Sequence, residues 1–209
     1  MVIGVLYSFR PVPVLSSYAI TAMALYPIAA WTSLLLLGSE DETQRQVSAV
    51  HAGGLVRVYL AKLVGVLLCS LVLTALAMAV PSLLHEFPSQ PTVPELLVGL
   101  LAHLTSALPG VLVGALFSNP IVRRQGYALG GVLLCLLLTI PADDLRGVHQ
   151  GAARLVGHLT PPMLAVIRAL SSTTSAGTAA RLLRPDALGA AVFAMLAGAL
   201  YLRLARSRS

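Results

Sequence analysis

Long apolar segments alternate with short polar ones along this chain, at a spacing that predicts membrane-spanning helices. A bilayer core of about 30 Å requires about 20 residues in a helix. The apolar segments come near or above that length and contain almost no ionisable side chains. They predict five spans, at residues 13–37, 55–80, 95–117, 125–142 and 187–204. We therefore expect an all-α integral membrane protein, a bundle of about five transmembrane helices in a single domain, 1–209.

Residues 39–53, between the first two spans, combine charged and apolar positions at helical spacing. Ser39 and Glu42 have the spacing of a capping box, and the acidic residues around them suit the positive end of a helix dipole. Gly53 and Gly54 permit the left-handed turn that ends a helix. This stretch predicts a short amphipathic helix in the cytoplasmic interface.

Residues 145–171, before the last span, have apolar side chains at roughly helical spacing on both sides of the Pro161–Pro162 pair. Proline disfavours a continuous helix at this point. We expect a broken helix there, made of two amphipathic pieces at the outer leaflet.

The composition agrees with a membrane protein, since 57% of the residues are hydrophobic and 11% are charged, whereas soluble domains average about 25% charged. The formal net charge of +6 comes from arginines at the ends of the spans. This placement indicates membrane topology and argues against a nucleic-acid partner.

The distribution of arginines predicts which ends of the spans are cytoplasmic. A short connector contains Arg123 and Arg124, and a basic tail follows the last span. The loop at residues 81–94 contains neither Lys nor Arg, which suits the outside. The positive-inside rule then predicts a multi-pass protein of the plasma membrane with a cytoplasmic C-terminus.

Polar and helix-breaking residues inside the third span are candidates for a pathway or a hinge. His103 is the one ionisable side chain in the apolar block 96–122, and such residues commonly face the interior of a bundle. One alternative is a neutral imidazole that bonds within the bundle, with Thr105 and Ser106 as candidate partners. Pro109 and Gly110 are expected to kink the helix.

Small residues four positions apart predict close helix packing in lipid. The contacts are expected either within one chain or across a dimer. These packing positions are Gly110, Gly114, Gly126, Gly130, Ala194 and Gly198.

The order of elements around residues 39–62 resembles the permease subunits of type-2 ABC exporters. An apolar span is followed by an acidic and Arg-containing amphipathic helix, a glycine pair, and Arg57-x-Tyr59-x-x-Lys62 leading into the next span. The broken helix before the last span is also similar to that family's re-entrant element. The family has six spans, and the match covers spans two to six. Residues 1–9 are too few to cross a membrane and are expected to be the outer end of an otherwise absent span.

The resemblance implies that a soluble ABC ATPase subunit docks on the helix at 39–53 and drives export of an unknown substrate. ATP and Mg would bind to that partner, and no cofactor or metal to this chain. It also implies a homodimer, or a heterodimer with another permease subunit, surrounded by membrane lipid. The docking residues would be Glu40, Asp41, Glu42, Gln44, Arg45, Val47 and Val50. The start of the next span would be formed by Gly53, Gly54, Arg57, Tyr59 and Lys62.

Two alternatives stay open from the residues themselves. One is a non-transporting membrane scaffold or an immunity-type protein with the same bundle. The other is a membrane enzyme with an outer-face acidic site at Asp143, Asp144 and His149. The chain's only lysine, Lys62, lies outside any GxxxxGK phosphate loop, so we expect a transport subunit without an ATPase site and without catalytic residues.

Overall fold

The computed structural model describes residues 13–84, 87, 89–119, 121–122, 124–139, 163–172 and 175–207, without the side chains of residues 42 and 163–165. Every regular element within these ranges is an α-helix. The helices are α2 (Val14–Gly38), α3 (Glu42–Ala52), α4 (Leu55–Leu83), α5 (Val93–Leu116), α6 (Gln125–Thr139), α9 (Met163–Ser171) and α10 (Ala176–Ser207).

Four of the described helices, α2, α4, α5 and α10, are long and apolar enough to cross a membrane. They contain 25, 29, 24 and 32 residues, and a helix rises about 1.5 Å per residue. The sequence predicts five spans. The predicted span at 125–142, fourth in chain order, contains α6, which has 15 residues, and it ends outside the described residues. The all-helical class is therefore confirmed, the four long apolar helices are compatible with a membrane protein, and a fifth span stays a prediction.

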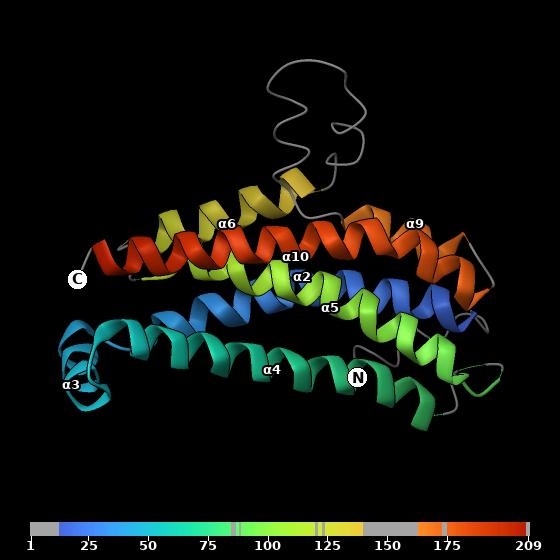
Figure 1. The fold of residues 1–209 in the computed structure, drawn as a ribbon, viewed down its shortest axis with the longest axis horizontal. Helices are drawn as coiled ribbons and strands as arrows, with labels where there is room; N and C mark the ends of the chain where they lie inside the picture. The colour runs from blue at the N-terminus through green and yellow to red at the C-terminus, as the bar shows by residue number, and fades with distance from the viewer. Residues whose placement is uncertain are drawn as a thin grey trace, which may run out of the picture.

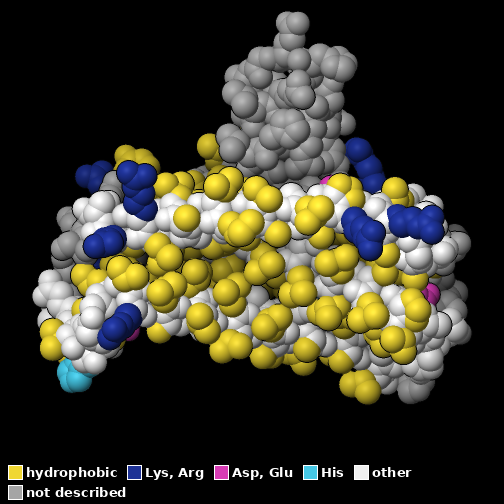
Figure 2. Space-filling view, in the orientation of Figure 1, with side chains coloured by type: hydrophobic (Ala, Val, Ile, Leu, Met, Phe, Trp, Pro, Cys, Tyr) yellow, Lys and Arg dark blue, Asp and Glu magenta, His cyan; other side chains and the backbone are white. Residues whose placement is uncertain are grey.

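The long helices lie side by side along the long axis of the molecule (Figure 1). One end of this bundle holds α3 and the C-terminus, and we call it the α3 end. The other holds α9 and the start of α10, and we call it the α9 end. Hydrophobic side chains cover the middle of the visible face, while Lys and Arg side chains gather towards both ends (Figure 2). This distribution suits a molecule whose middle lies in hydrocarbon.

The α2–α5 pair forms the centre of the bundle. In the most apolar stretch of each helix, 67% of the residues are buried in α5 and 50% in α2, against 17% in both α4 and α10. α2 contributes to all three hydrophobic clusters. In the first it packs with α5, α9 and α10, and in the second with α4, α5 and α10. In the third it packs with α6. The outer helices therefore turn much of their apolar surface away from the protein.

The region before the last span differs in part from the predicted arrangement. The helix α10 begins eleven residues before the predicted span 187–204 and continues through Pro185. Ala179 and Leu183, which precede this proline, are fully buried in the cluster with α2 and α9. Packing of this kind maintains a helix across a missing backbone bond.

The second of the two predicted outer helices corresponds to α9. Val166 and Leu170 of α9 are fully buried against α2, α5 and α10, so its apolar face packs on protein. The predicted first helix and the break at Pro161–Pro162 lie outside the described residues.

Candidate functional site

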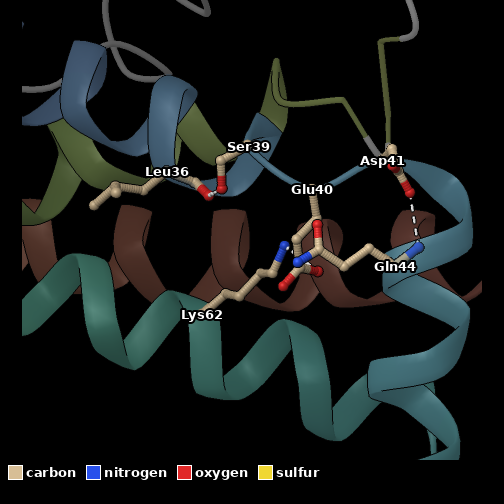
Figure 3. A network of polar contacts seen from close by, with 6 residues as sticks. All are labelled: Leu36, Ser39, Glu40, Asp41, Gln44 and Lys62. Carbon is tan, nitrogen blue, oxygen red and sulfur yellow. Dashed lines mark hydrogen bonds and ion pairs between the residues drawn. The ribbon is translucent and has the colours of Figure 1, made fainter.

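The helix α3 begins at Glu42, and its N-cap lies two residues later than the sequence predicts. Its N-cap is Asp41, whose backbone is extended and whose carboxylate Oδ1 accepts a hydrogen bond from the Gln44 backbone N–H at 2.7 Å (Figure 3). The prediction that Ser39 caps this helix is wrong. Ser39 keeps a right-handed helical backbone, and its hydroxyl donates to the Leu36 carbonyl oxygen at 2.9 Å, so it completes α2. An N-cap residue needs a non-helical backbone, which Asp41 has.

The predicted glycine pair ends α3. Gly53 has φ 72° and Gly54 has φ 140°, both in the range that favours glycine. The Gly54 N–H donates to the Ala49 carbonyl at 2.8 Å and the Gly53 N–H to the Val50 carbonyl at 3.3 Å, which is the Schellman pattern. The Arg57 guanidinium also donates to the Ala52 carbonyl at 3.2 Å. A cation at this position suits the negative end of the helix dipole.

An ion pair connects the start of the α3 segment to α4. Glu40 Oε2 and Lys62 Nζ are 2.7 Å apart, and the two side chains are 22% and 17% exposed. Lys62 lies two turns into α4, and the Gln44 side chain of α3 extends towards the pair (Figure 3). The carboxylate of Glu40 therefore serves an internal contact, and the prediction that it is presented to a docking partner is not supported.

The outward surface of α3 is apolar at its centre. Val50 is 81% exposed and Val47 is 53% exposed, and Gln46 beside them is exposed as well. Arg45 is partly buried, and the Glu42 side chain lies outside the described part of the chain. Of the predicted docking residues, Asp41, Gln44, Val47 and Val50 are exposed to a partner, and the two valines are the apolar ones among them.

The predicted start of the next span links α4 to the last helix. Tyr59 is 3% exposed, and its ring packs edge-on against the ring of Tyr201 of α10, with centroids 6.1 Å apart and an interplanar angle of 73°. Tyr201 is fully buried in the same cluster. The residues that follow α3 therefore connect it to α4 and, through this ring contact, to α10.

His103 joins the two central helices. Its side chain is fully buried, with Nδ1 2.7 Å from the Gly99 carbonyl oxygen and Nε2 3.0 Å from Thr21 Oγ1 of α2. Because a carbonyl only accepts, a neutral imidazole carries its proton on Nδ1 and accepts at Nε2 from the Thr21 hydroxyl. The alternative of an imidazole bonded within the bundle fits this geometry.

The partners predicted for His103 are wrong. Thr105 and Ser106 donate instead to the Leu101 and Ala102 carbonyls of their own helix, at 2.7 and 3.0 Å. Hydroxyl side chains commonly bond the carbonyl four residues earlier in a helix, which removes their donor from contacts between helices. The true partner, Thr21, is 82 residues away in sequence.

Glycines on α5 let its backbone approach α2. A Cβ added at Gly110 would lie 2.5 Å from the Tyr26 carbonyl oxygen, and one at Gly114 would collide with the Ala30 carbonyl. The Ser33 hydroxyl donates to the Val111 carbonyl at 2.7 Å across the same contact. α5 is one continuous helix through Pro109, and the predicted kink or hinge at Pro109 and Gly110 stays a prediction.

Sequence reasoning missed Gly99, which belongs to the same surface. A Cβ there would lie 2.5 Å from the Tyr18 ring. The signal was available, because Gly99, His103, Gly110 and Gly114 are spaced by four, seven and four residues, which is the period of one helix face.

The other predicted packing positions behave differently. Nothing lies within 4 Å of a Cβ added at Gly126 or Gly130 of α6. On α10, Ala194 is half-buried, and a Cβ at Gly198 would make an ordinary contact of 3.8 Å with Leu112. Close packing within the chain is therefore confirmed at Gly110 and Gly114, whereas Gly126 and Gly130 have no such contact with the residues that the structure describes.

The residues of the enzyme alternative, Asp143, Asp144 and His149, lie outside the described residues. Within the described ranges no three His, Cys, Asp or Glu side chains come together as they would around a metal ion.

Comparison of this chain with protein-family models, with curated proteins and with solved structures gives no match. The candidate site is therefore defined by its own geometry. It is a short helix at one end of a helical bundle, fixed at both ends, with two exposed valines among polar residues on its outward surface.

Proposed function

We propose that this chain is the permease subunit of an ATP-driven exporter and that α3 is the docking helix for a separate ABC ATPase subunit. The observation that carries the proposal is the way α3 is presented. Val47 and Val50 are exposed on a helix that is fixed by the Asp41 cap at its start and by the Gly53–Gly54 turn at its end. An amphipathic helix with apolar anchors one turn apart is a common form of docking element.

The attachments of α3 supply a route for coupling. A push on α3 reaches α4 through the glycine turn and through the Glu40–Lys62 ion pair. From α4 it reaches α10 through the Tyr59–Tyr201 contact. In the proposed mechanism, ATP-driven closure of the ATPase subunits tilts these helices and opens a route for the substrate. ATP and Mg bind on the partner.

The charges at the two ends support a cytoplasmic α3 end. The α9 end of the described chain contains Arg168, Arg181 and Arg184. The α3 end contains Arg45, Arg57, Lys62, Arg124, Arg203 and Arg206. By the positive-inside rule we place this end, with the C-terminus, in the cytoplasm of a cell with the protein in its plasma membrane. The unit would be a homodimer or a heterodimer with another permease subunit, with span 125–142 as its fifth span.

Site-specific photocrosslinking tests the docking role. A photocrosslinking amino acid at Val50 is introduced in the full chain in its native membrane, followed by purification and mass spectrometry. The matched control is the same amino acid at Leu83, which is 73% exposed near the other end of the bundle. We expect an ABC ATPase subunit to be captured from Val50 and not from Leu83. Capture of lipid or of this chain alone from Val50 would overturn the proposal.

Loss-of-function variants separate coupling from chemistry. If α3 couples the permease to its ATPase, Glu42→Ala and Arg45→Ala abolish export-dependent growth or resistance, while Asp143→Ala and His149→Ala leave it intact. The reverse result would favour the enzyme alternative, and no effect from any of the four would favour the scaffold.

A further inference from the structure

Two cavities follow the contact between α4 and α5, from the middle of the bundle towards the α9 end. The inner cavity has a volume of about 170 Å³ and lies between residues 67–74 of α4 and residues 104–108 of α5. The outer cavity has a volume of about 360 Å³ and lies between residues 75–83 of α4, residue 96 of α5 and the loop at 90–91. On α4 the lining includes Leu67, Leu71, Thr74, Met78 and Ser82. These positions are three or four residues apart, so the two cavities lie along one face of α4, and we call them together the α4–α5 groove.

The inner part of this groove offers no free polar group on α4. Ser70 and Thr74 line it, but their hydroxyls donate to the Val66 and Ser70 carbonyls of their own helix, at 3.0 and 2.9 Å. The remaining lining is Leu and Ala. The inner cavity is therefore suited to hydrocarbon.

Polar residues line the groove at its outer end. Ser82 and Gln90 lie there, near the end of α4 and in the loop that follows it. The Ser82 hydroxyl donates to the Met78 carbonyl of its own helix at 3.2 Å, so the Gln90 side chain supplies most of the polar character of this end. α4 extends from Leu55 to Leu83, so the inner cavity surrounds the midpoint of this span and the outer cavity lies near its end. The groove thus changes from apolar to polar between the bilayer midplane and the interface, as a lipid molecule does.

The mouth of the groove faces the surroundings of the bundle. Leu71 on its rim is 46% exposed, and Leu68 and Leu76 beside it on α4 are 57% and 51% exposed. At this depth in a membrane-spanning helix the surroundings are lipid hydrocarbon. Among the residues that the structure describes, no charged side chain lines either cavity. This lining would recognise the chain of a lipid more than the charge of its head group.

We propose that the α4–α5 groove binds one acyl chain of a bilayer phospholipid from the leaflet at the α9 end. The chain end occupies the cavity at Thr74 and Leu104, and the head-group region lies near Ser82 and Gln90. This site is independent of the docking role of α3, and either proposal can fail without the other.

Native mass spectrometry of the full chain in phosphatidylcholine nanodiscs tests the site. We expect wild type to retain one phosphatidylcholine per chain after release. Thr74→Phe fills the inner cavity from its floor and Leu104→Trp closes it from the α5 wall, and both are expected to lose the retained lipid. Thr74→Val removes the hydroxyl without filling the cavity, and Leu68→Phe adds the same ring outside the groove. Both controls are expected to retain the lipid.

Three results would overturn the assignment. The first is a wild-type protein that retains no phosphatidylcholine, or cavity-filled variants that are monodisperse and retain as much as wild type. The second is that the protein purified from its own membrane carries an amphiphile other than a phospholipid, and that Thr74→Phe removes this amphiphile. The third is efficient disulfide formation between copies through Leu71→Cys in a Cys69→Ser, Cys135→Ser background, which would assign the groove to a second copy.

Discussion

The α5 and α6 helices contain the same sequence motif with opposite structural outcomes. Gly110 and Gly114 of α5 lie against the backbone of α2, where a Cβ would collide with carbonyl oxygens. Gly126 and Gly130 of α6 have open space around them, and both are exposed. Two glycines four residues apart permit another helix to approach closely, but only α5 has a helix packed against that face.

The other contacts that α5 and α6 make with α2 explain why the glycines of α5 are packed and those of α6 are not. The surface of α5 that carries the glycines also carries His103 and accepts a hydrogen bond from Ser33, so α2 and α5 are joined by directional contacts as well as by packing. α6 contacts α2 through the smaller cluster with Ala30 and Leu34 and through a longer bond of 3.3 Å between Tyr26 Oη and Thr139 Oγ1. Gly126 and Gly130 therefore face outward, while the opposite side of α6, with Ala128 and Gly131, packs on the protein.

The largest expected effect comes from Gly114→Leu. The new side chain would push against the Ala30 backbone, which cannot move aside as a flexible side chain can. Overpacking of a core typically costs about 1–3 kcal/mol, and a clash with backbone lies at or above the top of that range. The apparent melting temperature in mild detergent should fall sharply, or the protein should fail to accumulate in the membrane.

The matched control for that variant is Gly130→Leu, the same substitution on the open α6 face. It should change the melting temperature by a few degrees at most. Equal losses from the two variants would remove the contrast between the helices.

A second prediction compares the polar contacts of the two helix pairs. Thr21→Val keeps the side-chain shape but leaves His103 Nε2 without its donor in a fully buried site. Hydrogen bonds between membrane helices average about 0.6 kcal/mol and reach about 1.7, and we expect Thr21→Val to cost about 1–2 kcal/mol. Tyr26→Phe removes the longer α2–α6 bond and should cost less. A double-mutant cycle with His103→Leu measures the coupling, and zero coupling would contradict the prediction.

A third prediction concerns how α3 is attached. Lys62→Met removes the ion pair with Glu40, which is largely shielded from water. Such pairs near a surface contribute up to about 1 kcal/mol, so global stability should change little. Amide hydrogen exchange within α3 should accelerate several-fold, and Glu40→Gln should add nothing further in the double variant. Unchanged exchange in α3 would show that the glycine turn alone fixes the helix.

The smallest effect is expected from Gly130→Ala. If the open α6 face meets lipid, alanine should stabilise the helix by up to about 1 kcal/mol, because glycine has the lower helix propensity. If the face packs closely on a second copy, the same substitution should weaken the dimer. Thermal unfolding together with chemical crosslinking of the purified protein separates these results.

Local sequence signals predicted local structure well. The glycine pair ends α3 because only glycine adopts both backbone conformations without strain. The predicted N-cap of α3 was two residues too early. Ser39 and Asp41 are both good capping residues, but the end of α2 extends through Ser39. The choice between two adequate caps depends on where the preceding helix stops, which the local pattern does not specify.

Contacts between distant segments were harder to predict. Glu40 was identified as a docking residue and Lys62 as part of the start of the next span, but not as partners of one another. Tyr59 was identified as part of a motif, while its contact with Tyr201 of α10 has no signal in either segment. Each pairing depends on which helices lie side by side, and that depends on the packing of the whole bundle.

The sequence by itself determined that this is a helical membrane protein, with an amphipathic helix between its first two long helices. Those features follow from the length of apolar segments and from backbone preferences, which act over a few residues. Only the tertiary structure decided which apolar face is buried, which glycines meet a backbone and which partner His103 takes. The physical reason is that lipid and protein interior are similarly apolar. In a soluble helix polarity marks the buried face, whereas in α2 and α4 hydrophobic residues occur on all sides.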